Sequence, residues 1–221
     1  MGVNETGRTE VKVVIAGITF LEDKIESLTI EKNLLSDKGL AIGMCNSAQL
    51  DVSVWTDGKT IPKAAKIEPF VRTVNGTSIG AWIPKGVFYV SERSVEFDGN
   101  KTTFHAYDSM RKASVKMIPD GESIGQWPLS MREVAKEIAE RIDVELEDET
   151  TVSNTYEVGY PSDYTMLELM SHIAAAHGGN WIITDKNKLR LVKVGDIPAE
   201  TFRMVTEVGD PIQIGDDLIR G

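Results

Sequence analysis

Three polar side chains near residue 105 are of the types that nucleophilic hydrolases use. His105, Asp108 and Ser109 could supply a base, an orienting acid and a nucleophile. A catalytic triad, however, is assembled from segments that lie far apart in the sequence, and in a strand His105 shares its face with Tyr107. We therefore expect structural roles for these residues and no nucleophilic catalysis.

A phosphate-binding loop is suggested by Gly58-Lys59-Thr60, which has the ending of that motif. The motif also requires a glycine five residues before Gly58, and Ser53 stands there. Pro62 would interrupt the helix that should follow the loop. We interpret the segment as a hairpin turn.

A calcium-binding loop is suggested by Asp185, Asn187 and Asp196, which occupy the first, third and twelfth positions of its spacing. The sixth position requires glycine for a sharp turn, but it holds Arg190. These charged residues are better explained as members of a hairpin turn.

Metal and redox chemistry have few candidate ligands, because the chain has one cysteine, Cys45, and three histidines. His172 and His177 are five residues apart on a predicted helix, so their side chains point about 140° apart. His177 beside Gly178 is better placed to interact with the helix C-terminus, and Cys45 is expected to be buried and inert. We predict no catalytic residue, no metal site and no cofactor.

The composition is that of an ordinary globular protein. The chain has 221 residues, of which 41% are hydrophobic and 26% are charged. No apolar run approaches the roughly 20 residues that span a bilayer, and residues 1–10 lack the layout of a signal peptide. We expect synthesis in the cytoplasm and no membrane insertion.

The net charge of −10 belongs entirely to the second half of the chain. Residues 1–113 carry 14 basic and 14 acidic side chains, whereas residues 114–221 carry 10 basic and 20 acidic ones. Stable binding of DNA or RNA needs a cluster of cations that displaces phosphate counterions, and the sequence contains none. Nucleic acid is therefore not expected as a stable ligand.

The first half has the pattern of short antiparallel strands. Gln49 to Trp55 alternates between apolar and polar residues, and Val11 to Ile18 and Ile25 to Leu34 are further candidate strands. Asn75-Gly76 and Asp98-Gly99 stand between strand-like runs, as in tight hairpin turns. We predict an antiparallel meander that forms a β-barrel or a sandwich.

The second half has the pattern of an α+β unit. Ser130 with Glu133 and Thr165 with Glu168 each predict a capping box at a helix start, with Leu129–Val134 and Tyr164–Leu169 as hydrophobic staples. The first helix should run to about Arg141, and the second should end at Gly178-Gly179. Trp181 to Thr184 and Leu189 to Val194 predict a hairpin. Residues 1–115 and 116–221 are predicted as two domains; the second is acidic and either short or incomplete at its C-terminus.

Two groups of segments have patterns that occur together in a known family. The first group has a strand that contains Gly86 to Val90 and another that ends in Ala106-Tyr107-Asp108. The second group is a helix, Gly178-Gly179 and a hairpin. Over the ranges 25–31, 41–55, 82–92, 103–108, 165–184 and 189–191, the chain resembles the baseplate hub proteins of phage and prophage tails (late control D-like).

The resemblance implies a mainly β fold of two β-barrel-like domains and a structural role without catalysis. It implies a homotrimer at the tail tip that joins the tail tube protein to the spike protein, with the tape-measure protein as a further candidate partner. The chain would then be made in the bacterial cytoplasm and be a component of a virion or of a phage-like particle.

Two alternative functions remain open. One is a tail tube or distal tail protein, which would form a hexamer. The other is a small cell-wall hydrolase or carbohydrate-binding module, for which Glu92 and Glu96 are candidate carboxylates.

The acidic second half suits a hub through which DNA passes, because carboxylates on a channel wall repel phosphate. The segment Asp143 to Glu149 would contribute to such a wall. The alternative interpretation is an acidic solvated face that keeps the protein soluble.

Overall fold

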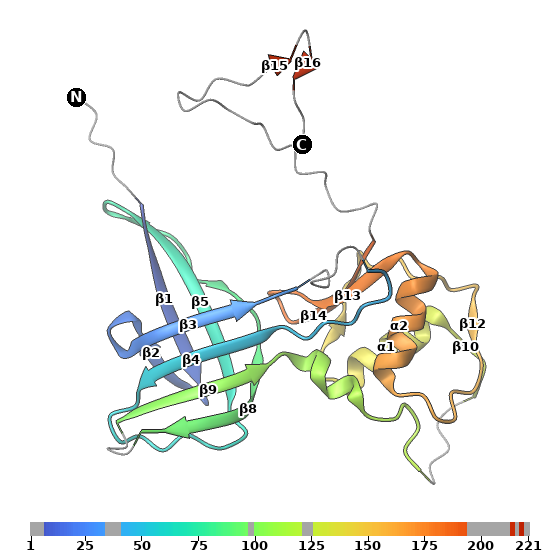
Figure 1. Ribbon diagram of the computed structural model, residues 1–221, viewed down its shortest axis with the longest axis horizontal. Helices are drawn as coiled ribbons and strands as arrows, with labels where there is room; N and C mark the ends of the chain where they lie inside the picture. Colours follow the sequence, from blue (N-terminus) through green and yellow to red (C-terminus); the bar gives the residue numbers. More distant parts are fainter. Residues whose placement is uncertain are drawn as a thin grey trace.

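The computed structural model describes residues 7–33, 41–96, 100–120 and 126–193, together with the backbone of residues 213–214 and 217–218. The long strands of the first half lie on one side of the molecule, and both α-helices lie on the other side (Figure 1). The fold is mainly β, as the sequence predicts.

The described residues of the first half form nine strands and two 3₁₀ turns. They are β1 (Arg8–Ile15), β2 (Ile18–Leu21), η1 (Glu22–Lys24), β3 (Ile25–Glu31), β4 (Gln49–Trp55), β5 (Lys66–Asn75), β6 (Ser78–Ile79), β7 (Ile83–Pro84), β8 (Phe88–Val95), β9 (Lys101–Tyr107) and η2 (Ser109–Ser114). The strand predicted from the alternation of residues 49–55 has the predicted bounds.

These strands form one antiparallel sheet with the order β2-β1-β5-β8-β9-β4-β3, and β6 and β7 pair with β5. The simple meander is therefore wrong, because β4 lies between β9 and β3, and β5 lies beside β1. Asp57 and Gly58 both have positive φ and form a tight turn, but β4 does not pair with β5 across it. A turn dipeptide reports only the local backbone and not which strands become neighbours.

A closed barrel is not confirmed, because β2 and β3 end the strand order and are not paired with each other. These two end strands are nevertheless consecutive in the chain and are joined by the three residues of η1. The sheet therefore curves back on itself and remains open between its two edges.

The hairpin predicted at Asn75-Gly76 is confirmed. Asn75 pairs with Ser78 across a two-residue loop, and Gly76 at the first loop position has a φ of 56°. A glycine with positive φ at this position is typical of a type II′ turn. The predicted pairing of β8 with β9 is also present, although the Asp98-Gly99 turn lies outside the described residues.

In the second half, the residues that the structure describes form two α-helices and several short strands. They are β10 (Leu129–Ser130), α1 (Met131–Arg141), β11 (Glu145–Leu146), β12 (Glu157–Val158), α2 (Met166–Ala176), β13 (Gly179–Ile183), β14 (Lys188–Lys193), β15 (Gln213–Ile214) and β16 (Asp217–Leu218). The predicted hairpin is present as the antiparallel pair β13–β14, and β11 joins the other edge of β14 in parallel. The predicted α+β pattern is confirmed.

Both predicted capping boxes are present. The Ser130 side chain accepts from the N–H of Glu133, and the Glu133 carboxylate accepts from the N–H of Ser130 at 2.8 Å. Thr165 and Glu168 make the same reciprocal pair at the start of α2. Each pair satisfies two of the backbone donors that a helix start leaves open.

The residues before these caps differ from each other in their packing. Leu129 packs against the buried cluster that contains Val134, as a staple requires. Tyr164 is 48% exposed, and its ring contacts the His172 ring edge-on with the centroids 5.6 Å apart. The contact described for Tyr164 is therefore one turn beyond the predicted partner, Leu169.

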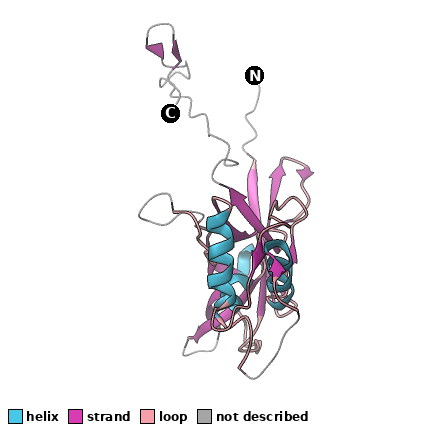
Figure 2. Ribbon diagram, turned by 90° about the vertical axis from the view of Figure 1, so that its right-hand side faces the viewer, coloured by secondary structure: helices cyan, strands magenta, loops and turns pink. Residues whose placement is uncertain are grey.

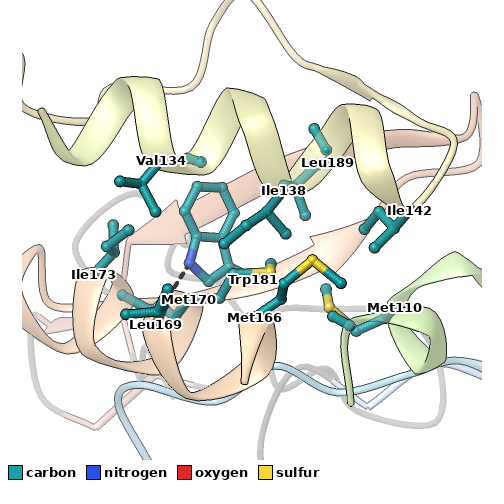
Figure 3. Packing of buried hydrophobic residues seen from close by; sticks show 14 of the residues in the cluster. Met110, Val134, Ile138, Ile142, Met166, Leu169, Met170, Ile173, Trp181 and Leu189 are labelled. Atoms are coloured by element: carbon teal, nitrogen blue, oxygen red, sulfur yellow. Dashed lines mark hydrogen bonds between the residues drawn. The ribbon is translucent and has the colours of Figure 1, made fainter. Parts of the chain in front are cut away.

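The buried hydrophobic residues form two clusters. One fills the curved sheet, and the other lies between α1, α2 and the β11-β14-β13 sheet. In the second cluster, the fully buried Trp181 lies between the helices, and its indole N–H donates to the carbonyl of Met170 at 2.8 Å (Figure 3). Figure 2 shows both helices from the end of the molecule remote from the first-half sheet. Along the chain, Ala106 belongs to the first-half cluster and Met110 to the second-half cluster. The predicted domain division at residues 115 and 116 stays a prediction.

Candidate functional site

The three residues considered as a catalytic triad, His105, Asp108 and Ser109, have separate structural roles. His105 is exposed on β9, and its ring pairs with Asp51 on β4. Asp108 is buried and accepts hydrogen bonds from Ser47 Oγ at 2.8 Å and from two backbone N–H groups, so it caps η2. Burial raises the pKa of the Asp108 carboxyl, against the effect of these hydrogen bonds. The side chain of Ser109 is fully buried, so it is not exposed as a nucleophile would have to be.

The carboxylate candidates of a cell-wall hydrolase do not form a suitable pair. Glu92 lies on β8, and Glu96 lies just after this strand and forms an ion pair with Lys101 at 2.6 Å. Four residues along a strand separate their Cα atoms by about 13 Å. Glycosidase carboxylates lie roughly 5–9.5 Å apart across a cleft, so this arrangement does not support the hydrolase.

The predicted turn residues near Asp185 are part of a contact between the two halves. Asp185 pairs with Lys32 and with Lys85, the latter at 3.2 Å. Asn187 adopts a φ of 58° in the β13–β14 turn, and Asp196 lies outside the described residues. In the described part of the chain, no three His, Cys, Asp or Glu side chains are grouped to hold a metal ion.

His177 interacts with the C-terminus of α2, as predicted. Its Nδ1 lies 2.8 Å from the carbonyl of Ile173 and donates to it, so its Nε2 is free to accept. Nε2 accepts from the backbone N–H of Ser153 at 2.9 Å. His177 therefore ties the loop after α1 to the end of α2, while His172 packs on Tyr164 instead.

Cys45 is a weak nucleophile in this structure. Burial raises the pKa of its thiol to about 12, so the thiol stays protonated at neutral pH. Its Sγ lies 3.8 Å from the carbonyl of Leu167 in α2.

Cys45 belongs to a segment that connects the two halves, a contact that sequence reasoning did not predict. Residues 41–46, which precede β4, lie along β13 of the second half. Gly43 N–H donates to the carbonyl of Gly179 at 2.9 Å, and Trp181 N–H donates to the carbonyl of Met44 at 2.8 Å. Cys45 also forms an isolated parallel bridge with Trp181. The segment thus adds a short fourth partner to the β11-β14-β13 sheet.

A shallow groove of about 470 Å³ crosses the first-half sheet on its outer face. Its floor is the ion pair between Glu10 and Arg72, at 2.6 Å, and its walls include Leu21 and Trp82. The Trp82 ring contacts the Arg72 guanidinium at 4.4 Å and the Lys12 ammonium at 4.8 Å. Because Arg72 and Lys12 already contact the Trp82 ring, this groove does not offer the ring as a binding site for a further cation.

Three solved structures resemble this fold. The 43 kDa tail protein of prophage MuSo2 from Shewanella oneidensis has a TM-score of 0.54 and 13% identity, over 84% of this chain and 56% of that one. A tail protein from Neisseria meningitidis MC58 has a TM-score of 0.47 and 12% identity, over 83% of this chain and 51% of that one. Prophage tail protein gp18 from Listeria monocytogenes EGD-e has a TM-score of 0.48 and 11% identity, over 90% and 53%.

The chain shares the fold of a prophage tail protein. At 13% identity, the likeness to the Shewanella protein shows the fold alone. The chain spans about half the length of these three proteins. No family model matches the chain, and no curated protein matches it in sequence.

Neither helix in the described part of the chain has the length and apolar character needed to cross a membrane. The residues that sequence reasoning selected for chemistry are distributed over separate places in the fold, among them β8 and β9, the cap of η2, the segment before β4, α2 and the turn after β13. The structure therefore does not assemble these candidates into one site. The features that remain for a function are the exposed surfaces and the contact between the two halves.

Proposed function

We propose that the chain is a structural component of a phage tail or a phage-like particle. The observation that carries this proposal is the fold likeness to the MuSo2 tail protein, which extends over 84% of the chain and so includes residues of both halves. The structural engagement of His105, Asp108 and Ser109 supports a role without catalysis.

Within the tail, we propose the position of a baseplate hub that joins the tail tube to the spike, as a homotrimer. The curved first-half sheet and the compact α+β second half are two unlike units in one chain, connected by the segment 41–46. Two units per chain allow three copies to place six units, of two alternating kinds, against a sixfold tube, while the ring itself has the threefold symmetry of a spike. A tail tube or distal tail protein would instead form a hexamer.

Oligomeric mass tests this position. Light scattering on the chromatographed protein should give three times the chain mass of 24.3 kDa. A mass of six chains would favour the tube or distal tail protein, and a monomer at all concentrations would contradict both ring-forming roles.

We also propose that the ring encloses a channel with a carboxylate-rich wall, which lets DNA pass without adhering. The 20 acidic residues after residue 113 make the second half the source of this wall. An electron cryomicroscopy map of the ring should show more channel carboxylates from residues 114–221 than from the first half. A channel lined by lysines and arginines would contradict this proposal.

A further inference from the structure

A long stretch of the second half has charge of one sign only. Residues 142–185 contain nine Asp and Glu residues and no Lys or Arg. A segment of this length that lacks cations must find its counter-charges elsewhere in the fold or in a partner.

Some of these acids find counter-charges within the chain. Asp143 pairs with Lys112 at 2.9 Å, and Glu145 pairs with Lys188 at 3.1 Å. Asp148, Glu149 and Glu157 have no ion pair within 4.0 Å in the part of the chain that the structure describes. Unbalanced negative charge therefore remains on this surface.

Exposed aromatic side chains accompany this charge. Tyr156, Tyr160 and Tyr164 are 62%, 55% and 48% exposed. They follow one another at four-residue intervals along the chain. In space, Tyr156 lies beside the N-terminal end of α1, and Tyr164 directly precedes the cap of α2. The strand β12 within this segment lies at the end of the molecule remote from the first-half sheet (Figure 1). We call residues 156–164 the tyrosine rim.

Backbone hydrogen bonds and a ring contact hold the tyrosine rim in place. The N–H of Met131 donates to the carbonyl of Tyr156 at 2.9 Å, and the N–H of Met117 donates to the carbonyl of Tyr164 at 2.9 Å. The ring of Tyr160 packs edge-on against Trp127 with the centroids 6.3 Å apart. Binding to a fixed segment loses less conformational entropy than binding to a free one, so these contacts favour recognition.

Tyr156 and Glu157 are the most available pair on the rim. In the described part of the chain, the Tyr156 ring contacts no other ring or cation, and the Glu157 side chain has no hydrogen bond. Elsewhere in the molecule, cations do lie over tyrosine rings, as Arg111 does over Tyr107 at 4.4 Å. On the rim, Asp163 beside Tyr164 pairs with Lys116 at 3.6 Å, whereas Glu157 beside Tyr156 has no ion pair among the described residues.

We propose that the tyrosine rim is a docking surface for a basic, arginine-containing segment of another protein. A guanidinium can stack on a tyrosine face while it pairs with a neighbouring carboxylate, and arginine does this better than lysine because its charge is planar and weakly hydrated. The negative charge of the surface disfavours nucleic acid as the occupant. The proposal does not depend on the position of the chain in a tail.

The test compares labelled octa-arginine and octa-lysine peptides by fluorescence anisotropy, with the full chain at low salt. The decisive variant is Tyr156→Ala/Glu157→Gln, which removes one exposed large side chain and the adjacent acid. The matched control is Leu21→Ala/Glu22→Gln, which makes the same kind of change where β2 ends and η1 begins and where Leu21 is 52% exposed. Both pairs lie on the surface, so both variants should keep the thermal midpoint of the wild type. Tyr160→Ala serves as a second rim variant.

The wild type should bind octa-arginine about threefold or more tightly than octa-lysine, since only the first can stack well. The rim variant should weaken octa-arginine binding about fivefold and lose the preference for arginine, whereas the control should stay within about twofold of the wild type. Equal weakening by both variants, or no preference for arginine, would overturn the proposal. Binding of a chitin tetrasaccharide that the rim variant abolishes, without arginine selectivity, would overturn it in favour of a glycan.

Discussion

The side-chain amide of Asn180 on β13 accepts a hydrogen bond of 2.8 Å from the backbone N–H of Met44. The same amide donates to the carbonyl of Ala41 at 2.8 Å. Asn180 is 2% exposed, so both of these backbone groups are satisfied by one buried side chain. This residue fixes the connecting segment 41–46 to the second half.

Asn180→Ala should therefore destabilise the protein strongly, because it leaves two backbone groups at the junction without their partner. Each buried group left unsatisfied costs about 1–3 kcal/mol. Denaturant unfolding should show a total loss in the range of about 2–4 kcal/mol. The control is Asn46→Ala in the same segment, since Asn46 makes an exposed bond to the carbonyl of Asn33 and should cost little. Equal effects of the two substitutions would contradict the role assigned to Asn180.

Gly76→Val should lower the free energy of unfolding by more than about 1 kcal/mol, because a β-branched residue is strained at the positive φ of this position. Thr77→Val is the matched control, since Thr77 is the other loop residue and its φ is not positive. An unchanged thermal midpoint for Gly76→Val would argue against the predicted turn.

Ser130→Ala and Thr165→Ala should each destabilise the protein by about 1 kcal/mol, because each removes the acceptor for a backbone N–H at a helix start. Ser162→Ala is a suitable control, because Ser162 is exposed and caps no helix. A loss of stability no larger than that of the control would mean that water replaces the caps.

The capping boxes should also weaken in acid. The hydrogen bonds from the Ser130 side chain and backbone N–H lower the pKa of Glu133, and those from the Thr165 backbone N–H and side chain lower the pKa of Glu168. A carboxyl whose pKa is lower in the folded state stabilises the fold above its unfolded pKa, about 4.3, and this contribution is lost as the pH falls through the lowered value. Glu133→Gln/Glu168→Gln should therefore reduce the dependence of stability on pH below about pH 4.5, as followed by thermal unfolding. An unchanged acid profile would contradict this assignment.

The features that the sequence predicts well are those decided by neighbouring residues. The Ser130–Glu133 and Thr165–Glu168 boxes span four residues each, and the alternation of residues 49–55 determines one strand by itself. The hairpins at Gly76 and at Asp185 likewise depend on short loops.

The features that the sequence does not predict depend on residues far apart in the chain. The pairing of β1 with β5 brings together Arg8 and Val74, and nothing in either strand alone selects that neighbour. The segment 41–46 has no strand alternation, and its contacts with Asn180 and Trp181 lie more than 130 residues away in the sequence. The junction between the two halves therefore became apparent only in three dimensions.

We propose that the chain is a structural part of a tail, at its tip. Gold-labelled antibodies against the chain, applied to tail particles purified from the bacterium that encodes it, test this claim most directly by electron microscopy. If the chain is a hub, the label should lie at the end of the tail that carries the spike. Label along the whole tail would contradict the hub position, and purified tails without label would contradict the structural role itself.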